Sequence, residues 1–140
     1  MKKKMLVTCA ALSVAWCFFA AVAFAAEFTW TGGGSGWADG ANWGGTAPGA
    51  GDTAVIPSGF DVTVADGDVA TVGALGAIRV EGSLVFLNTS SAVTIAGNIS
   101  GAGAITSQGA VGITLAGDNV GHTGRMEFTN SNVTVTSRTT

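Results

Sequence analysis

The sequence predicts an all-β domain built as a parallel β-helix, and three observations lead to this fold class. From residue 52 onward, short runs rich in Val, Ile, Thr or Phe alternate with Gly, Asn, Asp or Ser, as in short strands joined by turns. No window shows apolar residues at helical spacing over the length of a helix. Residues 93–101 align without gaps on residues 113–121, which is an internal repeat with a constant offset of twenty positions. A repeat of this length is enough for one coil, whose strands would pair with the coils above and below.

Residues 1–25 are predicted to be a secretory signal peptide that precedes the fold. Three lysines follow Met1, and no charged residue occurs between Leu6 and Ala26. Small residues at positions 23 and 25 stand where a signal peptidase reads the chain, so the mature protein is predicted to begin at Ala26, without a transmembrane segment. An uncleaved membrane anchor is the alternative, because an apolar run of this length approaches the roughly 20 residues that span a bilayer.

Removal of the signal peptide changes the composition of the chain. Both cysteines and all three lysines lie in it, so the mature chain has no thiol and has three arginines against nine acidic residues, a net charge of −6. Without disulfides, its stability must come from packing and hydrogen bonds. Because there is no basic patch for phosphate groups, nucleic acids and anionic membranes are not expected as partners.

Residues 26–51 are rich in tryptophan and glycine and are predicted to cap the first coil. Trp30, Trp37 and Trp43 supply the large apolar side chains of this segment. A terminal coil without such a cap would expose the core of the solenoid. A second interpretation makes the same three tryptophans a ligand-stacking platform, because flat aromatic faces suit sugar rings. Both roles are kept as hypotheses, with the cap favoured.

Residues 52–140 are predicted to form the solenoid repeats. Eight short strands are expected, at residues 53–56, 61–65, 78–80, 83–86, 92–95, 112–115, 126–129 and 132–136. Because side chains alternate along a strand, the repeat predicts two core columns and one outer column. The predicted core columns are Val93 with Ile113 and Val133, and Ile95 with Leu115 and Val135, and the outer column is Thr94 with Thr114 and Thr134.

The corners of the coils are predicted at the recurring Ala-Gly pair that precedes Asn or Asp, which places Gly97 and Gly117 at corners. Glycine is expected there because it adopts positive φ easily. The alternative fold is an antiparallel β-sandwich of similar short strands. A sandwich does not require one fixed offset between like triplets, so the β-helix is favoured.

Several motifs resemble those of autotransporter passengers. Trp30 with its following glycines, Asn42-Trp43, and residues 48–52 resemble the entry segment of such passengers. Residues 97–106 and 112–119 resemble the autotransporter-associated β-strand repeat, although the lysine that usually precedes its glycine is replaced in Ser107-Gln108-Gly109. The resemblance implies a right-handed parallel β-helix displayed outside the cell, in the periplasm, on the surface or in the medium. The mature chain is too short to hold both these repeats and a C-terminal outer-membrane barrel, so a truncated passenger is expected.

The sequence offers little sign of catalytic chemistry. His122 is the only histidine, so no site with two histidines can form within one chain, and we interpret it as a solvated turn residue. Asp61, Asp66 and Asp68 suggest a calcium site as an alternative, but their spacing matches neither an EF-hand nor the glycine-aspartate nonapeptide repeat. We therefore predict no catalytic residue, no metal and no cofactor.

The predicted function is that of a non-catalytic, exported, adhesin-like solenoid. The alternative is a small carbohydrate-binding module that uses the N-terminal tryptophans. The expected partners are a surface glycan or a protein ligand, and a second copy of the chain through the C-terminal edge of the solenoid. The last strand at the C-terminal edge of the solenoid would present unpaired backbone N–H and C=O groups, which favour self-association.

Overall fold

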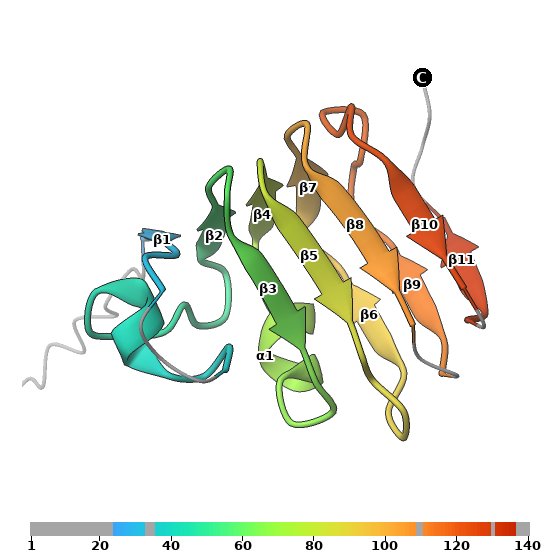
Figure 1. The fold of residues 1–140 in the computed structure, drawn as a ribbon, viewed down its shortest axis with the longest axis horizontal. Helices are drawn as coiled ribbons and strands as arrows, with labels where there is room; N and C mark the ends of the chain where they lie inside the picture. Colours follow the sequence, from blue (N-terminus) through green and yellow to red (C-terminus); the bar gives the residue numbers. More distant parts are fainter. Residues whose placement is uncertain (1–23, 33–35, 109–110, 130, 137–140) are drawn as a thin grey trace, which may run out of the picture.

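The computed structural model describes residues 24–32, 36–108, 111–129 and 131–136, and it shows a β-solenoid whose coils are stacked from the N-terminal to the C-terminal end (Figure 1). The strands are β1 (Glu27–Thr29), β2 (Thr53–Ile56), β3 (Asp61–Val64), β4 (Ala77–Val80), β5 (Ser83–Phe86), β6 (Val93–Ile95), β7 (Asn98–Ser100), β8 (Ala104–Ser107), β9 (Ile113–Leu115), β10 (Met126–Phe128) and β11 (Val133–Val135). The helical turns are η1 (Gly40–Trp43) and α1 (Val69–Gly73).

The strands form three parallel sheets, one along each side of the solenoid. Sheet A has the order β1-β2-β4-β7, sheet B the order β3-β5-β8-β10, and sheet C the order β6-β9-β11. All pairings between these strands are parallel, so the alternative of an antiparallel sandwich is wrong. A chain that visits the three sheets in turn places consecutive strands in different sheets and aligns strands one coil apart.

The register that the repeat predicts is confirmed in sheet C. Val93 pairs with Ile113, which pairs on its other side with Val133. Thr94 pairs with Thr114 one position along, and its side chain is exposed while those of Val93 and Ile113 are buried. The offset of the sequence repeat is therefore the length of one coil on this side of the solenoid.

The core is a stack of aligned apolar side chains from all three sheets. In sheet B, Val62, Leu84 and Ile105 lie in register with one another and are fully buried. Sheet A contributes Ile78 and Ile99 in the same way. Because each coil covers the apolar face of its neighbour, strands of only three or four residues can form one continuous core.

The corners depend on glycine for a reason different from the predicted one. Gly97 and Gly117 do not have positive φ. A Cβ at Gly117 would lie 2.0 Å from the carbonyl oxygen of Gly97, and a Cβ at Gly97 would lie 2.6 Å from that of Gly76. Gly82 and Gly103 form a second column of closely spaced glycines, because a Cβ at Gly103 would lie 2.2 Å from the carbonyl oxygen of Gly82. Glycine is required because successive coils approach closely at the corners.

Helix α1 takes the place of a sheet C strand in the first coil. It follows β3 and packs against β6, the first strand of sheet C. Val69 and Val72, three residues apart on one helical face, are buried in the core. The helix thus covers the N-terminal edge of sheet C, as β1 lies at the N-terminal edge of sheet A.

Most of the predicted signal peptide, residues 1–23, lies outside the described residues. Residues 24–26 are described, and all three are exposed and lie outside any strand. Neither helical turn of the described chain is long and apolar enough to cross a membrane. The segment 137–140 at the C-terminal end also lies outside the described residues.

Candidate functional site

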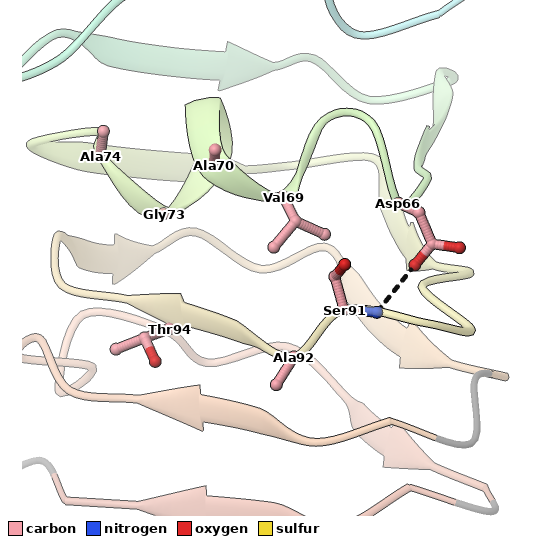
Figure 2. Close-up of a pocket in the computed structure, with 8 residues that line it drawn as sticks. All are labelled: Asp66, Val69, Ala70, Gly73, Ala74, Ser91, Ala92 and Thr94. Atoms are coloured by element: carbon pink, nitrogen blue, oxygen red, sulfur yellow. Dashed lines mark hydrogen bonds between the residues drawn. The ribbon is translucent and has the colours of Figure 1, made fainter.

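An open groove lies between helix α1 and strand β6 (Figure 2). It has a volume of about 550 Å³ and is lined by Asp66, Val69, Ala70, Gly73, Ala74, Ser91, Ala92 and Thr94. Small and apolar side chains form most of its wall, and Asp66 is the only ionisable lining residue. The groove therefore offers shape and a single carboxylate, but no set of reactive groups.

Asp66 is already engaged by the next coil of the protein. Its Oδ1 accepts hydrogen bonds from the backbone N–H groups of Ser90 at 2.9 Å and Ser91 at 3.1 Å. Its Oδ2 accepts one from the Thr89 hydroxyl at 2.9 Å. The Ser90 hydrogen bond is the main cause that lowers the pKa of Asp66 to about 2, against an opposing effect of desolvation. Asp66 therefore fastens the turn before β6 to the turn after β3.

The predicted alternative of a calcium site at three aspartates does not gain support from their positions. The Asp68 carboxylate accepts a hydrogen bond from the Ala65 N–H at 3.1 Å, within its own turn. Asp61 is exposed at the start of β3. Within the described residues there is no group of three His, Cys, Asp or Glu side chains that could hold a metal ion.

The three tryptophans of the N-terminal segment form one buried cluster. Trp43 lies between the other two, with ring centroids 5.0 Å from Trp30 and 4.9 Å from Trp37, both in edge-to-face arrangements. The Trp43 indole N–H donates a hydrogen bond to the Trp37 carbonyl oxygen at 2.7 Å. All three rings belong to the hydrophobic core, and none is more than 8% exposed. The three rings therefore pack on one another and on the apolar core of the solenoid.

The burial of Trp30, Trp37 and Trp43 leaves little open aromatic face for the ligand-stacking interpretation, which stays a prediction. A sugar stacks on an aromatic face that is open to solvent, whereas these faces are covered by one another and by the core. The sequence could not show this, because Trp-rich and Gly-rich segments occur both in caps and in binding sites. A Trp-to-Ala substitution here would remove packing and not only a contact surface.

His122 also differs from its predicted environment. The sequence predicts a solvated turn residue, but both ring nitrogens are buried without a hydrogen-bond partner in the described part of the chain. Its backbone forms an isolated parallel bridge with Gly101, which continues sheet A by one residue pair. The backbone of His122 thus extends sheet A one coil beyond β7.

The outer faces of sheets B and C are the remaining candidate surfaces for binding. Sheet C presents the threonine column of Thr94, Thr114 and Thr134, and its three strands contain no charged residue. Sheet B presents Thr63 and Thr106 in the corresponding outward positions. The sequence predicted the first column but not the second, because β8 was not expected as a strand.

Comparisons with known proteins found no relative of this chain. No protein-family model matches the chain, and neither curated proteins nor solved structures gave a significant match. The resemblance to autotransporter-associated repeats therefore stays a prediction from the quoted motifs.

Proposed function

We propose that this chain is an exported, non-catalytic β-solenoid that serves as a surface-display or adhesin-like scaffold. The observation that carries the proposal is the aligned threonine column on sheet C, outside a continuous apolar core. Strands one coil apart are about 4.8 Å apart, so the column is a regular row of hydroxyl and methyl groups. The cationic and apolar start of the sequence supports export.

The chemistry of this face favours an uncharged partner. Because the sheet C strands carry no charge, long-range electrostatic attraction adds little to association. Binding would depend on hydrogen bonds from threonine hydroxyl groups and on contact with their methyl groups. A neutral surface glycan or a polar protein segment fits these requirements.

Export is tested with the full-length chain carrying a C-terminal tag in a bacterial host. The cytoplasmic, periplasmic and secreted fractions are separated, and the intact mass of the tagged protein is measured in each. A processed species outside the cytoplasm is expected. Full-length protein confined to the cytoplasm would contradict the proposal, and full-length protein in the membrane fraction would favour the uncleaved anchor.

Binding is tested by screening the mature protein against a glycan array and a panel of extracellular-matrix proteins. Thr114→Lys places a long charged side chain in the middle of the threonine column. Thr63→Lys makes the same change on the outer face of sheet B and is the matched control. We expect binding to fall at least about tenfold, equal to 1.4 kcal/mol, in the first variant and to persist in the second. Equal binding by both variants would remove sheet C as the contact surface.

A further inference from the structure

The backbone just before β1 is held by the carboxylate of Asp52. The backbone nitrogen of Ala26 donates a hydrogen bond to Oδ1 of Asp52 at 2.9 Å. The carbonyl oxygen of Ala26 accepts one from the Thr53 N–H at 2.8 Å. Ala26 thus enters the pairing of β1 with β2, while Phe24 is 86% exposed. Among the residues that the structure describes, backbone hydrogen bonding to β2 starts at Ala26, where the sequence predicts cleavage.

We propose that Asp52 is the binding site for the α-ammonium group that proteolysis creates at Ala26. The inference rests on the proposed export of the chain. Hydrolysis of the Ala25–Ala26 bond by a peptidase consumes one water: its oxygen joins the carbonyl carbon of Ala25, and the Ala26 nitrogen becomes an amine, protonated near neutral pH. The nitrogen that now donates as an amide would then face Asp52 as a cation, which converts a hydrogen bond into an ion pair.

The arrangement around Asp52 suits this role. Its second oxygen, Oδ2, accepts a hydrogen bond from the Gly49 N–H at 2.8 Å, which fixes the orientation of the carboxylate. The hydrogen bonds from Ala26 and Gly49, in that order, lower the pKa of Asp52, so the group is ionised near neutral pH. On the strands of sheet A the only other charged side chains are Glu27 and Arg79, and they pair with each other at 3.2 Å.

The scissile bond is accessible in the structure. Residues 24–26 are exposed and belong to no strand or helix, so a peptidase can reach the bond before Ala26. Exposed backbone outside regular structure is the usual site of proteolysis. Every core residue that the structure describes lies after Ala26. The mature chain therefore keeps the packing that folds it.

The proposal predicts a particular pH dependence. Pairing with Asp52 raises the pKa of the α-amine in the folded protein, so the stabilisation is present at neutral pH and is lost as the pH rises through that pKa. At low pH, Asp52 becomes protonated. Because its pKa is lowered in the folded protein, the stabilisation is lost as the pH falls through that lowered pKa. The ion pair therefore acts between these two titrations.

Selective acetylation tests the ion pair in purified protein. A chain that begins at Ala26 is made by cleaving a fusion, and its α-amine is acetylated. All lysines precede residue 26, so the α-amine is the only aliphatic amine available. Acetylation keeps the N–H donor and removes the charge. We expect it to lower Tm at neutral pH in the parent chain but not in Asp52→Asn, and the difference should disappear above the amine titration.

An equal effect of acetylation in both chains would overturn the ion pair. Should Asp52→Asn fail to fold, the amine titration of the parent chain, followed by NMR in buffer and in urea, decides the matter alone. A higher midpoint in the folded state is expected, and equal midpoints would refute the proposal. These measurements do not depend on export. Exported protein that begins at another residue would overturn this inference while leaving the proposed function in place.

Discussion

Ile113 pairs with Val93 across adjacent coils of sheet C, and both side chains are buried in the core. The two residues occupy equivalent positions of the sequence repeat, so one coil of the solenoid brings successive copies of the repeat into direct register. The next residue along, Thr114, has its side chain on the outer face of the same strand.

The first prediction compares these two neighbouring positions. Ile113→Asp buries a carboxylate among apolar side chains without a partner, and we expect it to lower the free energy of unfolding by at least about 3 kcal/mol. Thr114→Asp makes the same substitution on the outer face, and its cost should stay below about 1 kcal/mol. Urea denaturation followed by circular dichroism measures both. Similar losses in the two variants would show that the register is wrong.

The second prediction concerns close approach at the corners. Gly117→Ala would place a Cβ 2.0 Å from the Gly97 carbonyl oxygen, so the coils must separate locally. We expect the free energy of unfolding to fall by about 1–3 kcal/mol, as for other overpacked positions. Gly67→Ala is the control, because no atom lies within 4 Å of its added Cβ and its φ is not positive. If thermal unfolding shows the same Tm for the two variants, the glycine columns are not needed for stacking.

Much of the fold was predictable from the sequence because a solenoid repeats. The predicted strands at 53–56 and 83–86 coincide with β2 and β5, and the other six overlap observed strands within one residue at either end. The strands β1, β7 and β8 were not predicted. Each holds a single large apolar residue, such as Ile99 in β7, between glycine-rich or polar neighbours, so its pairing across coils is what makes it a strand.

The contacts around the candidate sites were less predictable because coil length varies. Thr53 pairs with Ala77, an offset of twenty-four positions, whereas Val93 pairs with Ile113 at the shorter offset of the repeat. The first coil is longer because it contains α1, a single turn too short to show helical periodicity. A repeat with one fixed period therefore could not predict that Asp66 would meet residues 89–91.

The third prediction tests Asp66 by its pH dependence. Asp66→Asn removes the charge that the turn at residues 89–91 stabilises, and we expect a lower Tm than in the parent chain at neutral pH. Because the pKa of Asp66 is lowered from 3.8 to about 2, this difference should be constant above about pH 5 and shrink as the pH falls from about 4 toward 2. Asp61→Asn, at an exposed position, is the control. A difference that does not change with pH would exclude an electrostatic role.

In the described residues, the outermost C-terminal strands are β10 in sheet B and β11 in sheet C. Beyond β10 and β11, no further strand pairs with sheets B or C in the part of the chain that the structure describes. Val135, predicted to belong to a core column with Leu115, is 57% exposed and lies outside the buried core, and Phe128 is only partly buried against the core. Unpaired strand edges next to exposed apolar side chains are the usual starting points of edge-to-edge association.

The last prediction is that the chain, after processing, self-associates through this end. Pairing of β11 with a second copy would satisfy its free backbone groups and cover Val135. Val135→Lys should weaken association at least about tenfold by placing a charge at the edge, while Thr63→Lys on sheet B should not. Sedimentation over a wide concentration range measures association, and hydrogen exchange reports the edge. A strictly monomeric protein whose β11 amides exchange as slowly as those of β6 would contradict the idea. Slow exchange at β11 without association would mean that the edge is covered within one molecule.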